Sequence, residues 1–257
     1  METQTVIITG ASRGLGAAAA RHAALLGAHL VLNARSAASL NRLSAEISND
    51  GGQTLAVAGD ISHPETCQHL VELALKKFGH LDALVNNAGV IEPIAPIGQW
   101  DPAAWRKSLT TNVLGAIWMT QAALPHLRKR HGRVINVSSG AAVKVIRGWS
   151  AYCTAKAALN HFNRALAAEE SAITAIAFRP GVVDTAMQAV IREHGPAGMP
   201  EEEYARFVGY YHHGDLLPPE LPGRALATLA LFAPHEWSGD FLPWDDEKVK
   251  ALVGRSI

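Results

Sequence analysis

The sequence predicts a single α/β domain, a doubly wound parallel sheet of about seven strands with helices on both faces. Three observations support this fold class. Short β-branched runs alternate with longer helical stretches, the alternation continues from residue 5 to about 180, and no Gly/Ser-rich or charged linker interrupts it. Because strands that alternate with helices form parallel βαβ crossovers, both faces of such a sheet become covered. We therefore expect residues 1–257 to form one domain.

The individual elements follow from local composition and periodicity. Seven runs have the composition of strands, namely Thr5–Thr9, His29–Asn33, Thr54–Ala58, Ala83–Asn86, Arg133–Val137, Ile173–Phe178 and Phe241–Leu242. Apolar residues at helical spacing predict helices near 14–27, 36–48, 64–78, 102–128, 151–170 and 220–233. The rhythm breaks between Met187 and Leu221, a segment rich in proline. An irregular segment of this kind is typical of a lid, so we expect a substrate lid near 187–220.

Composition excludes several classes of protein. Lys+Arg and Asp+Glu both total 23, so the basic excess expected of a nucleic-acid or membrane-surface protein is missing. No apolar run approaches the roughly 18 residues of a membrane span. The two cysteines cannot build a disulfide framework, and the 12 histidines include no HExxH spacing. We expect a cytoplasmic protein without a metal and without nucleic-acid or membrane partners.

A glycine-rich loop follows the first strand and opens the first helix. Gly10, Gly14 and Gly16 have the spacing GxxxGxG. A glycine at the strand end allows a tight turn, and the other two let backbone N–H groups and the helix N-terminus approach a pyrophosphate. The glycines could serve the turn alone, but a position after the first strand of a βαβ series favours a nucleotide site.

The end of the second strand indicates which nucleotide. An NAD site usually has an acidic residue there for the ribose 2′-hydroxyl, whereas this strand is followed by Arg35 and has no acid. Arg35 and Arg13 of the glycine loop could both reach a 2′-phosphate, which arginine binds with paired N–H groups. Although either could be a solvated surface charge, their positions favour NADP(H).

A tyrosine and a lysine are four residues apart on a predicted helix. Tyr152 and Lys156 therefore project from one helix face, and Ser139 ends the fifth strand at the edge where parallel sheets bind ligands. A free phenol has a pKa near 10, and a neighbouring ammonium favours its ionised form. This arrangement predicts a site of proton exchange.

With these motifs in order, the chain resembles the short-chain dehydrogenase/reductase family over essentially its whole length. The resemblance rests on Thr9-Gly10-x-x-x-Gly14-x-Gly16, Asp60, Asn86-Asn87-Ala88-Gly89, Asn112, Ser139, Tyr152-x-x-x-Lys156 and Pro180-Gly181-x-x-x-Thr185. It implies a Rossmann fold and nicotinamide chemistry. It also implies that Tyr152 exchanges the proton, Ser139 polarises the substrate oxygen, Lys156 holds the ribose and lowers the Tyr152 pKa, and Asn112 orders a relay water.

The same resemblance implies a set of residues that contact the cofactor. Asp60 would contact adenine, and Thr185 would meet the nicotinamide carboxamide. The full set is Gly10, Ser12, Arg13, Gly14, Leu15, Gly16, Arg35, Asp60, Ile61, Asn87, Ala88, Gly89, Tyr152, Lys156, Pro180, Gly181, Val183 and Thr185.

A narrower similarity is to the sepiapterin reductase-like branch, especially the benzil reductases that form (S)-benzoin. It rests on residues 138–141, 148–152, 157–162 and 180–193. Pterin reduction in that branch uses an aspartate shortly after the last strand, but Pro243 stands there in this chain. A 1,2-diketone needs no such carboxylate. Ala141, Trp149 and Met187 are the expected substrate contacts.

The expected function is an NADPH-dependent carbonyl reductase for a small aromatic or vicinal dicarbonyl substrate, working as a homodimer or homotetramer. Two alternatives stay open. One is an NADP-dependent alcohol or steroid dehydrogenase that runs oxidatively. The other is a non-catalytic NADP(H)-binding sensor, which would have no need for Ser139, Tyr152 and Lys156 together.

Overall fold

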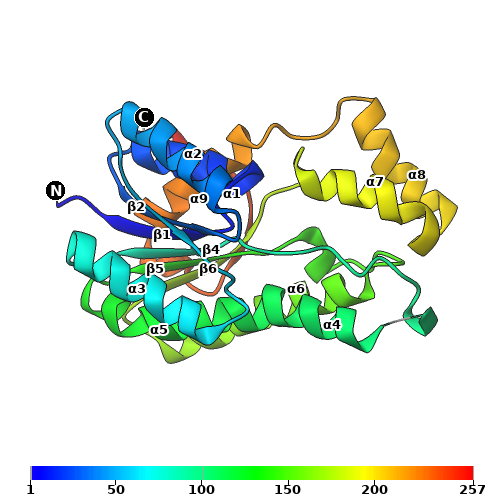
Figure 1. The fold of residues 1–257 in the computed structure, drawn as a ribbon, viewed down its shortest axis with the longest axis horizontal. Helices are drawn as coiled ribbons and strands as arrows, with labels where there is room; N and C mark the ends of the chain where they lie inside the picture. Colours follow the sequence, from blue (N-terminus) through cyan, green and yellow to red (C-terminus); the bar gives the residue numbers. More distant parts are fainter. Residues whose placement is uncertain (1, 100, 257) are drawn as a thin grey trace.

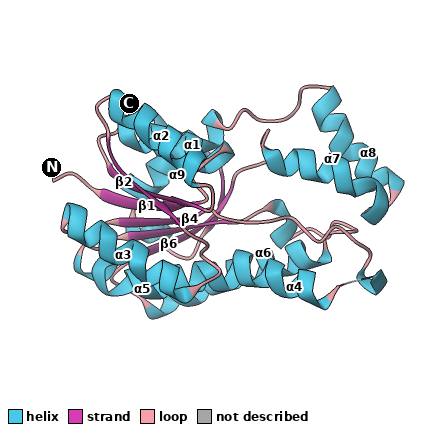
Figure 2. Ribbon diagram, viewed as in Figure 1, coloured by secondary structure: helices cyan, strands magenta, loops and turns pink. Residues whose placement is uncertain are grey.

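A parallel seven-stranded sheet forms the centre of the molecule (Figures 1 and 2). The structure is a computed structural model and describes residues 2–99 and 101–256. The strand order is β3-β2-β1-β4-β5-β6-β7. The bounds are β1 Thr5–Thr9, β2 His29–Ala34, β3 Gln53–Ala58, β4 Ala83–Asn86, β5 Arg133–Val137, β6 Thr174–Arg179 and β7 Phe241–Pro243. The expected fold class is confirmed, and every strand lies within about a residue of its predicted range.

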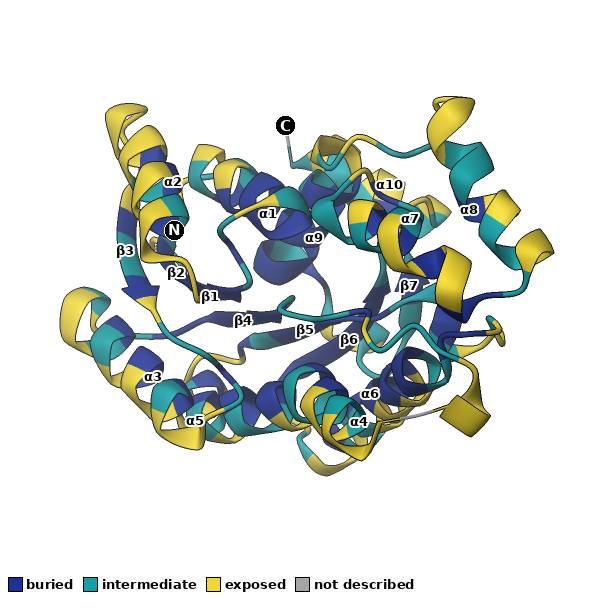
Figure 3. Ribbon diagram, turned by 45° about the vertical axis from the view of Figure 1, so that its right-hand side comes forward, coloured by how far each residue is buried: buried dark blue, intermediate teal, exposed yellow. Residues whose placement is uncertain are grey.

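Helices cover both faces of the sheet, and each face has its own apolar core. One layer contains α1 (Gly14–Leu25), α2 (Ala37–Asn49), α9 (Glu220–Phe232) and α10 (Glu247–Arg255). The other contains α3 (Pro64–Phe78), α5 (Gly115–Lys129) and α6 (Ser150–Glu169). Because both faces of the strands are covered, the central strands are almost entirely buried, whereas the edge strand β3 is exposed at both ends (Figure 3).

The helix expected over 102–128 is interrupted. It consists of α4 (Pro102–Leu109), a π-helical turn at Thr110–Leu114, and α5. Such turns insert one residue into a helix and often occur at functional sites. This one carries Asn112 and buries it to 1% exposure. Apolar periodicity predicted the helix but could not show the extra residue.

The prediction of an irregular segment after Met187 was wrong. Residues 186–212 form two helices, α7 (Ala186–Gly198) and α8 (Glu201–His212), which lie beyond the carboxyl edge of the sheet (Figure 1). Gly198 suggested a break in the helix, but its role is a packing one. A Cβ there would lie 2.0 Å from the main-chain oxygen of Ile94. Close packing, rather than a break in the helix, requires this glycine.

The strand order reverses between β1 and β4. From β1 the chain first moves outward through β2 and β3, and it then returns to place β4 on the other side of β1. After β1 and β4 the chain therefore continues to helices on opposite faces of the sheet, and open α/β sheets bind ligands at the carboxyl edge where this happens. No helix of the described residues is long and apolar enough to cross a membrane.

Candidate active site

The loops after β1 and β4 form one hydrogen-bonded unit at this edge. The Asn87 side chain donates hydrogen bonds from Nδ2 to the main-chain oxygens of Thr9 at 2.9 Å and Gly10 at 3.1 Å. In return, the Thr9 hydroxyl accepts the backbone N–H groups of Asn87 and Ala88 at 3.0 and 3.1 Å. A Cβ on Gly16 would lie 2.5 Å from Asn87 Nδ2, so glycine is required there for close packing. The glycine loop is therefore held rigidly before any ligand binds.

The N-terminus of α1 presents free backbone donors in this loop. Arg13 occupies the N-cap position in extended conformation, and its side chain makes no capping hydrogen bond. Gly10 and Gly14 have φ of +64° and +53°, a region that only glycine adopts readily. The uncapped N–H groups and the positive end of the helix dipole suit a phosphate group. The residues present therefore fit the pyrophosphate of a dinucleotide.

Arg35 and Asp60 lie close enough to interact at the ends of β2 and β3. Burial acts to raise the pKa of Asp60, but hydrogen bonds from Ser62 and the positive charge of Arg35 outweigh it, so the pKa is lowered. Asp60 Oδ1 accepts the backbone N–H of Ser62 at 2.9 Å. Arg35 is exposed, as is Arg13, and neither makes an ion pair within the described part of the chain.

The segment after β6 closes the edge of this site. A Cβ on Gly14 would lie 2.9 Å from Cγ2 of Thr185, so the glycine loop and this segment are in contact. Gly181 has φ of +82°, and Val183 is buried and forms a parallel bridge with Leu217. The remaining expected cofactor positions lie along these same loops: Ser12 and Leu15 beside the glycines, Ile61 after β3, Gly89 after β4 and Pro180 after β6.

Tyr152 and Ser139 meet beside this edge. Ser139 follows β5 and accepts the backbone N–H of Ala141 at 3.1 Å, which fixes its hydroxyl in the turn. Tyr152 is in the first turn of α6 and is buried to 6% exposure. Burial raises the pKa of Tyr152 to about 12, and the Ser139 hydroxyl lowers it by less. Tyr152 is therefore a protonated phenol at neutral pH.

Lys156 lies one turn further along α6, with its ammonium 5.6 Å from the centre of the Tyr152 ring. It is 4% exposed, and Nζ donates to the main-chain oxygen of Val137 at 2.7 Å. Burial lowers the pKa of Lys156 to about 8. The expected lowering of the Tyr152 pKa by Lys156 is not observed here, because burial dominates the electrostatics of both groups.

Asn112 is held in place by its side chain. Its Oδ1 accepts the backbone N–H of Val90 at 3.0 Å, and its Nδ2 donates to Val90 oxygen at 2.8 Å and to the Ser108 hydroxyl at 3.3 Å. A Cβ on Gly89 would lie 2.8 Å from Asn112 Oδ1 and 3.7 Å from Lys156 Nζ. The π-helical turn thus brings Asn112 beside Lys156, and both amide hydrogens of its side chain are already used.

An apolar cluster surrounds Tyr152 on the side of α7 and α8. Trp149 meets the Tyr152 ring edge-on at 6.0 Å between centroids and stacks at a tilt on Phe207 of α8 at 4.5 Å. The expected substrate contacts Ala141 and Met187 belong to the same cluster. Its other buried members are Ile91, Ile191, Met199 and Phe207, and the last three come from the segment expected to form the lid, although Ile91, Ile191 and Met199 were not singled out. Their dispersal over four segments of the chain left no local signal.

Sequence analysis also missed Arg179, the last residue of β6. Its place beside Ser139 depends on the pairing of β5 with β6. Burial raises the pKa of Cys153, which fits a helix residue better than a nucleophile. Among residues 2–99 and 101–256, no group of three His, Cys, Asp or Glu is arranged to hold a metal.

The fold is that of a nicotinamide-dependent dehydrogenase, Ser139, Tyr152 and Lys156 lie together at its carboxyl edge, and comparison with known proteins gives the family. The short chain dehydrogenase family model matches residues 4–195, so the chain belongs to the short-chain dehydrogenase/reductase family. It is an oxidoreductase that uses NAD(P)(H), as members of this family do. The family resemblance seen in the sequence is thereby confirmed.

Three relatives show how far the similarity extends. A benzil reductase ((S)-benzoin forming) of Saccharomyces cerevisiae is 36% identical over 263 residues, 98% of this chain and 99% of its own. The crystal structure of a short-chain dehydrogenase/reductase from the same yeast has a TM-score of 0.93 at 36% identity, over 97% of this chain and 99% of that one. An NADP-bound structure from Beutenbergia cavernae, assigned as an NAD(P)-dependent gluconate 5-dehydrogenase, has a TM-score of 0.81 at 30% identity, over 94% and 95%.

Proposed function

We propose that this protein is an NADPH-dependent carbonyl reductase that acts on small aromatic or vicinal dicarbonyl compounds. The observation that carries the proposal is the environment of Tyr152, a protonated phenol beside Ser139 and against an apolar aromatic cluster. A buried phenol with its pKa near 12 holds its proton at neutral pH, and reduction of a carbonyl requires a proton donor. Oxidation would instead require the phenolate, which the same burial disfavours.

Each polar residue of the site has a separate role in this proposal. NADPH, when bound, supplies the hydride for the carbonyl carbon. Ser139 donates a hydrogen bond to the carbonyl oxygen and Tyr152 transfers its proton to that oxygen, so negative charge does not build up there. Lys156 fixes the ribose and keeps a positive charge near the phenol. Asn112, beside Lys156, orders the water that relays the proton.

The glycine loop and its neighbours would hold the dinucleotide. The N-terminus of α1 suits the pyrophosphate. The Asn87 side chain holds the loop in place through its hydrogen bond to the main-chain oxygen of Thr9. Arg13 and Arg35 are exposed on the same side and lack carboxylate partners within ion-pair distance in the described chain. Since no acid ends β2, these two guanidinium groups favour the 2′-phosphate of NADPH over the free hydroxyl of NADH.

The apolar cluster supports the proposed substrate class. Ala141, Trp149 and Met187 would contact the substrate, with α7 and α8 acting as the lid near 187–220. The Nε1 of Trp149 is buried without a hydrogen-bond partner among the described residues, so a second carbonyl oxygen could accept its N–H. A benzil reductase among the relatives supports a vicinal dicarbonyl. We further propose a cytoplasmic homodimer or homotetramer.

The experiment that tests this function is a carbonyl panel with NADPH and NADH side by side, followed by loss of cofactor absorbance. Aromatic 1,2-diketones such as benzil should be reduced with NADPH well above the blank. Oxidation of simple alcohols or steroids with NADP⁺ should be slower. NADPH binding without turnover on any carbonyl or alcohol would indicate the sensor instead.

A further inference from the structure

Arg179 is a cation that the proposed mechanism does not use. Ile176 and Phe178 of β6 belong to the core under α1 and α9, so the alternation of the strand directs Arg179 to the opposite face, with Ala175 and α6. The strand that carries it pairs with β5, and Ser138 donates its backbone N–H to the oxygen of Phe178 at 2.7 Å. Arg179 is thus next to the turn that carries Ser139.

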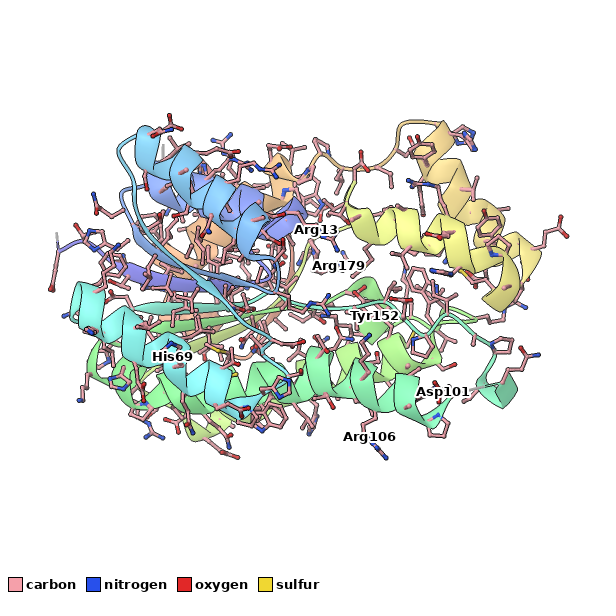
Figure 4. The ribbon with its side chains drawn as sticks, in the orientation of Figure 1. Arg13, His69, Asp101, Arg106, Tyr152 and Arg179 are labelled. Atoms are coloured by element: carbon pink, nitrogen blue, oxygen red, sulfur yellow. The ribbon has the colours of Figure 1, made fainter. Side chains whose placement is uncertain are left out.

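The side chain runs along this turn. A Cβ on Gly140 would lie 3.9 Å from Cδ of Arg179, so the aliphatic part of the arginine passes over the residue after Ser139. Arg179 is half-buried, and Figure 4 shows it between Arg13 of the glycine loop and Tyr152. A positive charge therefore lies close to the place where the carbonyl is reduced.

This charge has no partner in the protein. Within the part of the chain that the structure describes, Arg179 makes no side-chain hydrogen bond or ion pair. A planar carboxylate matches the paired N–H groups of such an arginine. Trp149 and Met187 provide the apolar wall on the far side of Tyr152. The site thus combines an aromatic wall with an anion-binding group.

We infer that Arg179 binds a carboxylate attached to the reacting carbonyl, so that the preferred substrates are aryl-substituted 2-oxo acids. The inference rests on the proposed carbonyl reductase function and narrows its substrate class. In the reaction, the ketone carbon gains a hydride from NADPH and the ketone oxygen gains the Tyr152 proton. The products are a 2-hydroxy acid and NADP⁺, and the carboxylate is unchanged. An anion of the cofactor is the other group that this guanidinium could bind.

A matched pair of substrates tests the inference. Benzoylformate and 1-phenyl-1,2-propanedione share the benzoyl group and differ in a carboxylate against an acetyl group. Arg179→Gln keeps polarity and removes the charge. It should raise the KM for benzoylformate by about tenfold to a hundredfold, as expected for a lost charged hydrogen bond, and leave that for the neutral diketone within about threefold. Arg179→Lys should recover part of the loss.

Two further measurements identify the anion that is bound. Arg106 of α4 is exposed and points away from Tyr152 (Figure 4), so Arg106→Gln controls for the loss of one positive charge. NADPH binding, followed by fluorescence titration without substrate, should be the same in Arg179→Gln and wild type. Weaker NADPH binding with an unchanged ratio between the two substrates would overturn the inference and assign Arg179 to the cofactor phosphates.

The outcome for the wild-type protein separates this inference from the proposed function. Reduction of 1-phenyl-1,2-propanedione but not benzoylformate would overturn the role of Arg179 and leave the carbonyl reductase intact. Reduction of neither compound, nor of any other carbonyl, would overturn both.

Discussion

The Lys156 ammonium donates a hydrogen bond to the main-chain oxygen of Val137 at 2.7 Å. This hydrogen bond joins the active-site face of α6 to the end of β5. Ser139 follows two residues after Val137, and Tyr152 is one helical turn before Lys156. The hydrogen bond therefore fixes the spacing between the two residues that would contact the substrate oxygen. Lys156 has this structural role in addition to any contact with the ribose.

The buried lysine predicts how stability depends on pH in the protein without cofactor. Because burial lowers the pKa of Lys156 to about 8, the folded state binds fewer protons than the unfolded state between pH 8 and 10.5, and stability rises with pH in that window. Relative to Lys156→Met, the wild type should gain about 2 kcal/mol between pH 7 and 9.5. Urea unfolding at the two pH values measures the difference. A constant difference would show that Lys156 is not desolvated as the structure indicates.

Tyr152 contributes with the opposite sign at higher pH. Its folded pKa is raised to about 12 from an ordinary value of 10, so the stability that it contributes is present below pH 10 and is lost as pH rises toward 12. Relative to Tyr152→Phe, the wild type should therefore lose stability between pH 10 and 12, measured by urea unfolding. Tyr152→Phe should remove the loss at high pH.

Tyr152→Phe should fold normally and lose nearly all reductase activity. The change removes only the hydroxyl that would deliver the proton, and general acid catalysis is typically worth about 10²–10⁴-fold. NADPH titration should still show binding, since the glycine loop and Lys156 are unchanged. Reduction at near wild-type rate would mean that another group delivers the proton.

Cofactor preference should depend on Arg35. Arg35→Asp would replace attraction of a 2′-phosphate by repulsion and should lower the ratio of kcat/KM for NADPH to that for NADH by at least about tenfold. Arg42→Asp on the exposed face of α2 is the matched control for surface charge. An unchanged ratio in Arg35→Asp would place the 2′-phosphate site elsewhere.

Trp149 should distinguish aromatic from aliphatic substrates. Burial of one phenyl ring is worth about 2–3 kcal/mol, so diacetyl should be weaker than 1-phenyl-1,2-propanedione by one to two orders of magnitude in kcat/KM. Trp149→Ala should narrow that gap, because the indole borders Tyr152 and is buried in the aromatic cluster. Trp118→Ala, at a partly buried residue of α5, controls for loss of a tryptophan elsewhere. An equal effect of Trp149→Ala on both diketones would contradict its role as a substrate wall.

Assembly is a separate prediction. Short-chain dehydrogenases usually form oligomers, and light scattering at micromolar concentration should give the mass of a dimer or tetramer. A monomeric mass would contradict this.

The fold and the proton-exchange pair were accessible from sequence because their signals are local. Strand composition and glycine spacing can be recognised within a short stretch of sequence. Tyr152 and Lys156 lie one turn apart on any helix that contains both, whatever surrounds them. The helices α7 and α8 were not predicted, because Pro196 and Gly198 look like helix breakers until Gly198 is seen packed on Ile94. Arg179 and the raised pKa of Tyr152 depend on strand pairing and burial, which no single segment encodes.

The stack of Phe207 on Trp149 makes the acidity of the proton donor depend on a helix that lies outside the sheet. Separation of α8 from Trp149 would let water reach the phenol, and the pKa of Tyr152 would then fall toward 10 because burial is what raises it. Proton affinity and enclosure are therefore thermodynamically linked in this protein. The phenol therefore holds its proton most firmly while α8 is in place, and it becomes a stronger acid when α8 is displaced.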